Sequence, residues 1–360
     1  MGERVDGWTV AWPRRKCSDS ETVLSALGPA RTAMSSKSPV TSQDKDTLLM
    51  TSFADALDQE IVVLDGGLAT QLEEQGHDLR DSLWSARLLR DEPDEIVAAH
   101  RAYVEAGADV AITASYHASY AGFANAGIDA DEATRLLALS VDLARRAQPA
   151  DRQTFVAGSV GLYGVVWADG TEYTGDYSRA TDDDVAAEQR RRIRAMVDAE
   201  ADLLAIETIP SGREAAILGE LLTEVPGTES WVTFCCRDDH HLSDGTPISE
   251  AVRAVTRTGR VTAVGVNCTP PQHVESLLAD ARTATDLPLV VYPNWGRIWD
   301  GATYEWIEGT GVVEFPTDLL DGWYDAGARV IGGCCGIGPR GIAGVSAWRA
   351  ARRSAAATNG

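Results

Sequence analysis

Residues Leu203–Ile209 read LLAIETI, an aliphatic run that carries a carboxylate, Glu207, near its end. Near-continuous apolar runs of this kind are typical of parallel strands buried on both faces. The same pattern, an apolar or β-branched run that ends in small or polar residues, recurs along the chain. The runs are Ile61–Gly67, Asp109–Tyr116, Thr154–Gly161, Leu203–Ile209, Trp231–Cys236, Ala263–Cys268, Leu287–Asn294 and Arg329–Cys335.

Helical patterns lie between these runs. Apolar residues in Asp94–Ala106 and in Val185–Asp198 recur at the helical period, and Glu250–Thr256 and Val274–Ala281 are shorter examples. Alternating strands and helices over roughly 290 residues predict a single (β/α)8 TIM barrel, an α/β fold. A doubly wound open sheet is the alternative, although no G-x-G-x-x-G motif follows a strand.

The composition excludes several partners. The chain has 360 residues, with 32 Lys and Arg against 54 Asp and Glu, a net charge of −22. So acidic a chain argues against binding to nucleic acid or to an anionic membrane. No membrane-spanning run and no secretory signal are visible. The six cysteines are too few for a disulfide scaffold and indicate a reduced, cytoplasmic setting. A homo-oligomer is left open.

Three regions differ in composition. Residues 1–50 hold all three lysines and a Ser/Thr/Lys-rich stretch, so we expect a largely disordered leader there. The alternative is a start codon assigned too early, with Met34 or Met50 as the true start. Residues 51–353 are expected to form the barrel and residues 354–360 a frayed tail.

In a (β/α)8 barrel the chemistry takes place at the carboxyl ends of the strands. Most of the predicted strands end in polar or sulfur-containing residues, which are expected to converge on one pocket. They are Asp65, Thr113, Ser115, Ser159, Glu207, Cys235, Cys236, Cys268, Asn294, Cys334 and Cys335. For Ser159 and Asn294 a helix cap or a closed turn is an equal alternative.

Cys268 and the pair Cys334–Cys335 end the sixth and eighth predicted strands. Inward side chains of alternate strands share a layer, so three thiolates could meet around one ion. Three sulfur ligands and an open fourth position describe a catalytic zinc site. Glycines beside the pair would let the backbone aim both sulfurs at one point. The alternative is that these cysteines are small core residues, and Cys235–Cys236 is expected in the core or pocket wall.

An open zinc position could take a substrate thiol and deprotonate it. An all-sulfur ligand set keeps that thiolate electron-rich, which favours thiol alkylation. Two alternatives belong to other classes. A zinc hydrolase would need a histidine or carboxylate ligand, but the histidines form neither H-x-H nor H-E-x-x-H. A non-catalytic, redox-sensing barrel would use Cys334–Cys335 as an oxidisable pair.

The motifs GVNC and GGCC that contain these cysteines resemble the homocysteine S-methyltransferase family. Further segments at the strand ends resemble the same family over about Ile61 to Ala350. They are Asp65–Gly67, Thr113–Tyr116, Gly158–Gly164, Gly170–Tyr177, Glu207–Pro210 with Glu214, and Ser243–Pro247. The resemblance implies a zinc-dependent TIM barrel that methylates L-homocysteine to methionine.

The resemblance also implies roles for individual residues. Cys268, Cys334 and Cys335 are implied to bind Zn²⁺ and to be catalytic through it. Asp65 and Glu207 are implied to hold the ammonium group of homocysteine. Gly66 and Thr113 are implied to lie near the carboxylate or backbone of homocysteine. Asn267 is implied to lie near the substrate and to support the zinc ligands. Alternatives are a turn residue for Asp65 and a helix-start carboxylate for Glu207.

The implied methyl donor is a sulfonium compound, S-methylmethionine or S-adenosylmethionine, with betaine as the alternative. Aromatic faces can hold such cations. The candidates are Trp84, Tyr163, Tyr173, Trp295 and Trp299, with core packing as the alternative for each. The family pattern PNSGE is PNWGR here, ending in Arg297. Arg297 beside a cationic donor is unfavourable unless its side chain points outward or pairs with Asp300. The donor could therefore differ, and so could the acceptor, which could be a selenol.

Overall fold

The computed structural model describes residues 51–79, 84–167, 169–296, 299–300, 305–306 and 311–359. The expected leader, residues 1–50, lies outside this part of the chain. Within it, none of the helices has both the length and the apolar character that crossing a membrane requires.

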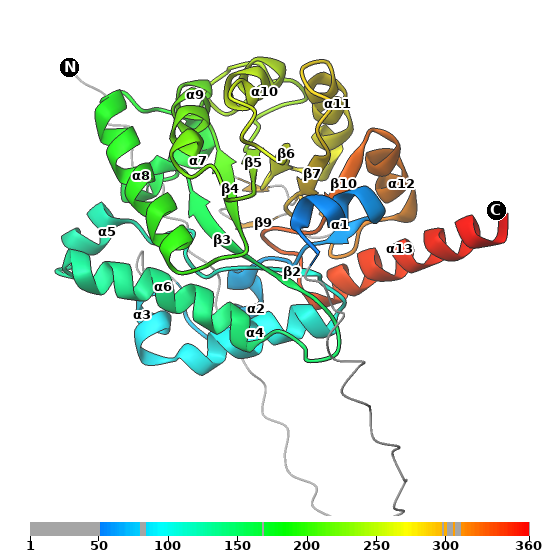
Figure 1. The fold of residues 1–360 in the computed structure, drawn as a ribbon, viewed down its shortest axis with the longest axis horizontal. Helices are drawn as coiled ribbons and strands as arrows, with labels where there is room; N and C mark the ends of the chain where they lie inside the picture. Colours follow the sequence, from blue (N-terminus) through cyan, green and yellow to red (C-terminus); the bar gives the residue numbers. More distant parts are fainter. Residues whose placement is uncertain are drawn as a thin grey trace, which may run out of the picture. The chain divides into compact units, whose positions relative to one another are not determined.

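Parallel strands form a barrel at the centre of the described chain (Figure 1). They are β1 (Val62–Val63), β2 (Val110–Ile112), β3 (Phe155–Gly161), β4 (Leu203–Ile209), β5 (Ser230–Phe234), β6 (Ala263–Asn267), β7 (Leu289–Tyr292) and β10 (Ala328–Ile331). The eight strands follow the order β1-β10-β7-β6-β5-β4-β3-β2, and a parallel bridge from Leu64 to Val110 joins β1 to β2. This closure confirms the barrel and rules out the open doubly wound sheet.

Helices cover the outside of the barrel (Figure 1). Those between the strands are α2 (Leu68–Glu74), α3 (Trp84–Asp91), α4 (Pro93–Glu105), α5 (Tyr120–Asn125), α6 (Ala130–Arg146), α7 (Thr171–Thr174), α8 (Asp182–Asp198), α9 (Gly212–Leu221), α10 (Ile248–Thr256), α11 (Pro271–Arg282) and α12 (Thr317–Asp325). Short 3-10 turns add η2 (Tyr163–Val166) and η3 (Leu222–Glu224). The apolar face predicted for α4 is buried, as its period requires.

Two features differ from the expectation. An antiparallel pair, β8 (Trp299–Asp300) and β9 (Glu305–Trp306), is inserted between β7 and α12. The expected tail continues the last helix instead, because α13 (Pro339–Asn359) runs through the alanine-rich end of the chain. Alanine has the highest helix propensity, which explains this correction.

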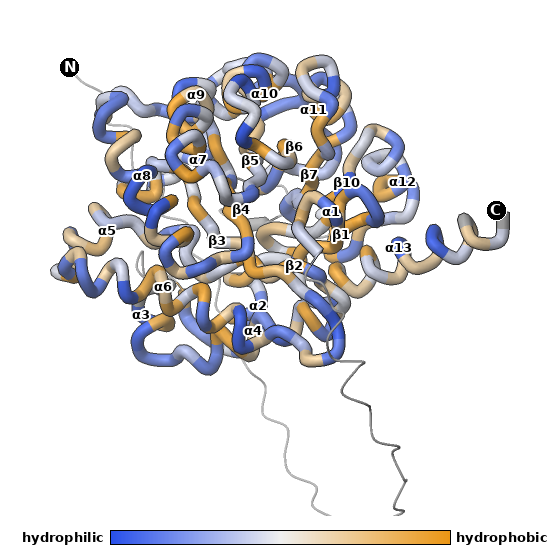
Figure 2. The backbone as a smooth tube through the Cα atoms, in the orientation of Figure 1, coloured by the Kyte–Doolittle hydropathy of each residue, from blue (hydrophilic) through white to orange (hydrophobic). Residues whose placement is uncertain are grey.

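The core has two layers. One lies between the strands and the helices, and hydrophobic colour follows the strands while polar residues occupy outer turns (Figure 2). The other fills the barrel and includes Phe53, Trp231 and Tyr292.

Phe53 comes from α1 (Phe53–Gln59), and its ring lies 5.9 Å from Phe155 and 5.6 Å from Trp231. These two rings belong to the start of β3 and β5, so α1 plugs the amino-terminal end of the barrel and leaves the opposite end for the site.

Candidate active site

Three cysteine sulfurs meet at the carboxyl end of the barrel. The Sγ of Cys335 lies 4.0 Å from that of Cys268 and 3.9 Å from that of Cys334, and all three lie within 4.8 Å of one another. A tetrahedral zinc with Zn–S bonds of about 2.3 Å requires sulfur separations of about 3.8 Å. The three thiols are free, and no other such group of potential ligands forms in the described part of the chain. The spacing fits one metal ion.

The backbone aims these sulfurs through unusual conformations. Cys268 directly follows β6 with a φ of 48°, which turns it out of the strand direction. After β10, a Cβ on Gly333 would lie 2.4 Å from Ile337, so only glycine fits there. Hydrogen bonds then fix the turn, because Cys334 N–H donates to Pro293 O at 2.8 Å. The glycines flanking the cysteine pair are therefore required by space.

The cluster opens toward solvent at one side. Cys268 is buried, Cys334 is half-buried and Cys335 is exposed. The thiols of Cys268 and Cys334 donate to the Cys335 sulfur, which holds the pKa of Cys335 well below its usual range. One thiolate is thus stabilised by the protein alone, and metal ligands must be deprotonated. An incoming group can approach beside Cys335.

Two buried carboxylates face the same end of the barrel. Asp65 Oδ2 accepts a hydrogen bond from Ile112 N–H at 2.8 Å, while Asp65 Oδ1 is buried without a partner among the described residues. Glu207 accepts from the hydroxyls of Ser159 and, at 3.1 Å, of Tyr292. Burial raises the pKa of Glu207 to about 7. Burial, and also the charge of Glu207, raise the pKa of Asp65. Neither carboxylate forms an ion pair with a residue that the structure describes, although the charge of Arg192 acts on Glu207.

Hydroxyl groups hold the end of β3 beside Glu207. Thr113 Oγ accepts from Ser159 N–H at 2.9 Å and lies 2.7 Å from Ser115 Oγ, which donates to Ser159 O. Ser159 therefore supports a carboxylate and is not a helix cap. A Cβ on Gly66 would lie 2.3 Å from Ile337 O, so glycine is needed for this close approach. Contact of Thr113 or Gly66 with a substrate remains a prediction.

The side chain of Asn267 bonds to the end of β4, and its support of the zinc ligands and of the substrate stays a prediction. Its Oδ1 accepts from Thr208 N–H at 2.8 Å and its Nδ2 donates to Thr208 Oγ at 2.7 Å. Thr208 has a φ of 62°, and the pairing of β4 with β5 breaks its register between Ile206 and Ile209. The break takes Thr208 N–H out of the sheet ladder, and a buried N–H needs a partner. Asn267 supplies it.

Asn294, Trp295 and Cys235 surround the cysteines. Asn294 Nδ2 donates to Cys268 O at 2.9 Å and its Oδ1 accepts from Gly296 N–H, so it closes a turn and also holds Cys268. The Trp295 indole packs over Gly336, where a Cβ would lie 2.2 Å from the ring. Cys235 stays outside the metal-sized group, with its Sγ 3.8 Å from Cys268 O. It is buried, as expected of a residue in the core or pocket wall, and burial raises its pKa to about 12.

The remaining aromatic candidates for donor binding differ in their surroundings. The Tyr163 ring packs edge-on against Trp167 at 5.2 Å and Tyr177 at 5.9 Å, so it belongs to an aromatic cluster, and its role in donor binding stays a prediction. Tyr173 is 63% exposed, and the charges of Cys268 and Cys335 raise its pKa, so it lies near the cysteines. The structure does not describe the side chains of Trp84, Trp299 and Asp300, nor any part of Arg297.

The sequence analysis missed Glu172, which precedes Tyr173 on α7. Ser243 Oγ donates to Glu172 O at 2.7 Å, and the charge of Glu172 contributes to raising the pKa of Cys235. The available signal was a carboxylate in a short segment between Gly170 and Gly175, within a stretch already quoted for its resemblance.

A buried framework supports the β3 loop that leads to α7. Arg192 donates to Gly161 O at 2.7 Å and to Tyr116 O at 2.8 Å. Glu214 accepts from Tyr163 N–H at 2.8 Å and from the Tyr177 hydroxyl. These bonds fix the base of the loop from α8 and α9.

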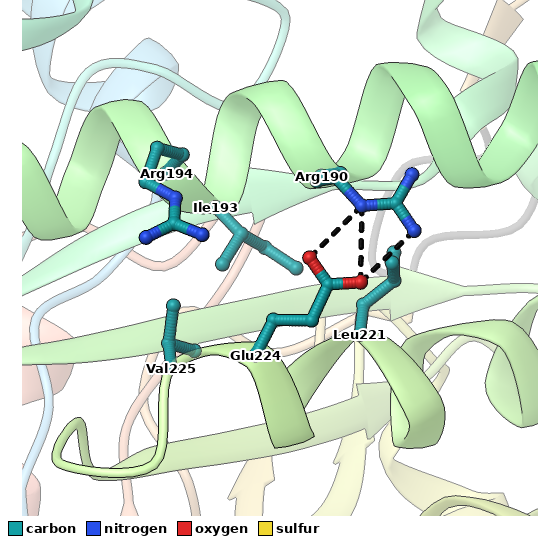
Figure 3. A pocket seen from close by; sticks show the side chains of 6 residues that line it. All are labelled: Arg190, Ile193, Arg194, Leu221, Glu224 and Val225. Atoms are coloured by element: carbon teal, nitrogen blue, oxygen red, sulfur yellow. Dashed lines mark hydrogen bonds and ion pairs between the residues drawn. The ribbon is translucent and has the colours of Figure 1, made fainter.

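A small surface pocket lies elsewhere, between α8 and η3 (Figure 3). Its lining is Arg190, Ile193, Arg194, Leu221, Glu224 and Val225. Glu224 is occupied by Arg190, whose Nε donates to it at 2.9 Å. The pocket contains no nucleophile or soft metal ligand, so the cysteine cluster remains the candidate active site.

Comparison with known proteins gives consistent matches. The family model described as Homocysteine S-methyltransferase matches residues 62–348. A homocysteine S-methyltransferase of Escherichia coli is 44% identical over 296 residues, covering 80% of this chain and 95% of that protein. One of Bacillus subtilis is 41% identical over 298 residues, covering 80% and 94%. The metallated crystal structure of the Escherichia coli enzyme MmuM superposes with a TM-score of 0.71, at 43% identity, covering 80% of this chain and 96% of that one.

Proposed function

The chain belongs to the homocysteine S-methyltransferase family, and on that premise we propose that it transfers a methyl group from a sulfonium donor to the sulfur of L-homocysteine, giving methionine. The observation that carries this proposal is the cluster of Cys268, Cys334 and Cys335 at one end of the barrel, spaced for a single metal ion and open on one side. A thiol acceptor suits such a cluster, because soft sulfur ligands select soft metal ions that bind further thiolates.

The metal we propose is Zn²⁺. The sulfur separations of 3.9 and 4.0 Å suit a tetrahedral ion. When bound, zinc deprotonates a coordinated thiol at neutral pH and so supplies the nucleophile. Within the described residues the cluster contains sulfur only, which disfavours a zinc hydrolase with histidine or carboxylate ligands.

Asp65 and Glu207 are proposed to bind the ammonium group of homocysteine. Two buried carboxylates with no cation between them raise each other's free energy when ionised. An ammonium supplies the missing charge and three hydrogen-bond donors. The unpartnered Asp65 Oδ1 offers one of the acceptors.

The transfer balances without a general base on the methyl group. The homocysteine thiol loses its proton on binding, and its sulfur then attacks the methyl carbon in line with the leaving group. The bond from that carbon to the sulfonium sulfur breaks, and its electron pair neutralises the sulfonium. With S-methylmethionine both products are methionine. The contribution of the barrel is to hold the two sulfur atoms in line.

A direct assay tests the proposal. Purified full-length protein with zinc and homocysteine is incubated with S-methylmethionine, S-adenosylmethionine or betaine, and methionine is measured by mass spectrometry. We expect turnover with a sulfonium donor. Absence of methionine with every donor would reject the proposal and revive a non-catalytic, redox-sensing barrel.

A ligand variant tests the metal. Cys268→Ser is expected to lose bound zinc and to reduce turnover more than about 100-fold, since even residues behind a ligand cost 10–100-fold. Cys17→Ser, outside the described residues, is the matched control and should keep both. A zinc-replete, fully active Cys268→Ser protein would contradict the ligand assignment.

A further inference from the structure

The short helix α7 lies against the cysteine site. Ser243 Oγ donates to Glu172 O at 2.7 Å and to Cys235 O at 3.2 Å, and Cys235 Sγ lies 3.8 Å from Cys268 O. Two intermediate residues therefore connect the backbone of Glu172 to a proposed metal ligand. This short path places α7 beside the cysteine site.

Glycines set the position of α7. Gly170 and Gly175 flank it with φ values of 80° and 63°. A Cβ on Gly175 would lie 2.6 Å from Asp244 and 2.8 Å from Pro210 O, so the helix end packs tightly against the loops after β4 and β5. The helix is thus held at its Gly175 end, with Thr171 buried and Tyr173 exposed.

The carboxylate of Glu172 has no counterion in the described part of the chain. It is half-buried, and the hydrogen bond that it accepts comes from its own backbone N–H. The charges that act on it, those of Cys335 and Asp169, are negative and, after burial, raise its pKa. A partly desolvated carboxylate among other negative charges is costly unless a cation joins it.

Two nearby arginines, Arg179 and Arg192, already have other partners. Arg179 pairs with Asp169 and stacks 4.1 Å from the Trp167 ring centroid. Arg192 is buried among backbone carbonyls, where it donates to Gly161 O and Tyr116 O. Neither is paired with Glu172, so within the described part of the chain, which leaves out Arg297, the cation beside this carboxylate is left to a ligand.

We propose that Glu172 binds the positive charge of the methyl donor and thereby selects cationic over neutral donors. The inference rests on the proposed function, because it assigns the second substrate of the same site. Homocysteine already has Asp65 and Glu207 for its ammonium group, whereas the donor has no other carboxylate assigned to it.

The chemistry predicts which kinetic constant changes. The sulfonium charge disappears as the methyl group leaves, so a nearby carboxylate stabilises the bound donor at least as much as the transition state. Removing it should raise the donor KM and leave kcat little changed. The homocysteine KM should stay the same.

The test uses zinc-loaded, full-length protein without homocysteine, so that no turnover occurs. Calorimetry compares the binding of S-methylmethionine with that of 2-amino-5-methylhexanoate, in which a neutral CH replaces the sulfonium sulfur. Wild type should prefer the cation. Glu172→Gln should lose about tenfold or more of this preference, because the amide lacks the charge that attracts the sulfonium. Glu172→Asp should retain part of it.

Asp176→Asn is the matched control, since Asp176 is an exposed carboxylate on the same loop, and it should keep the full preference. The inference is overturned if Glu172→Gln keeps the preference, if wild type shows none, or if Glu172→Gln raises the homocysteine KM instead of the donor KM. Failure of wild type to form methionine would reject the proposed function separately, because the binding ratio is measured without catalysis.

Discussion

Glu207 illustrates how burial sets the chemistry of one residue. Among the described residues, only the neutral hydroxyl groups of Ser159 and Tyr292 bond to its carboxylate, and burial raises its pKa to about 7. Below this pH the group is protonated and has lost its charge. Above it the carboxylate is ionised and can bind an ammonium group. Homocysteine binding should therefore improve as the pH rises through about 7.

We expect kcat/KM for homocysteine to rise between pH 6 and 8 with an apparent pKa of about 7. Glu207→Gln should remove this step and lower kcat/KM at pH 8 by about 10- to 100-fold, the range for hydrogen bonds to charged groups. Steady-state assays at saturating donor measure it. Glu224→Gln, which changes an exposed carboxylate, should keep the wild-type profile. An unchanged step in Glu207→Gln would assign the titration to another group.

Single residues also show where sequence reasoning stops. Asp65, Glu207 and the cysteines were selected because strand ends concentrate polar residues, and the structure brings them to one end of the barrel. The partner of Asn267 could not be predicted, because the left-handed conformation of Thr208 leaves no mark in a run such as LLAIETI. Glu172 lies in a short helix, so neither strand nor helix periodicity singled it out.

At the scale of elements, β4 and β6 are joined through their ends. Each carries a non-glycine residue with positive φ, Thr208 at 62° and Cys268 at 48°. Glu207 precedes the first and Asn267 precedes the second, and Asn267 bonds twice to Thr208. The side chain of Asn267 thus holds the conformation next to Glu207, the carboxylate proposed to bind homocysteine, and lies next to Cys268, a proposed metal ligand.

Asn267→Ala should therefore disturb two functions at once. It leaves a buried N–H without a partner, so the free energy of unfolding should fall by about 1–3 kcal/mol. Zinc affinity should fall about tenfold or more, and the homocysteine KM should rise. Urea unfolding, a competing chelator and steady-state kinetics measure these effects.

Asn267→Asp keeps the acceptor for Thr208 N–H but not the amide donor, and it should lie between wild type and Asn267→Ala. A variant that raises only the homocysteine KM, as Glu207→Gln is expected to do, would refute the coupling between the two strand ends.

The eight barrel strands were predictable because each is buried on both faces and so reads as an unbroken apolar run. The pair β8–β9 was not, because two-residue strands carry no period. The α13 extension was missed because its end, rich in alanine and small polar residues, resembles a tail in composition. Long, periodic elements were thus foreseeable, and short or compositionally plain ones were not.

For the whole barrel, the proposed metal would connect the ends of β6 and β10, which are separated in the sheet by β7. An ion that binds the folded chain but not the unfolded chain stabilises the fold by mass action. The gain is about 2.7 kcal/mol when the free ion concentration is 100 times its Kd. Zinc should therefore raise the Tm by several degrees, and a chelator should lower it reversibly.

Cys268→Ser should lose this response to zinc while Cys17→Ser keeps it, and magnesium should have no effect because thiolates bind hard cations poorly. Scanning calorimetry with and without each metal measures the shift. An equal zinc response in Cys268→Ser and wild type would mean that the ion binds elsewhere on the chain.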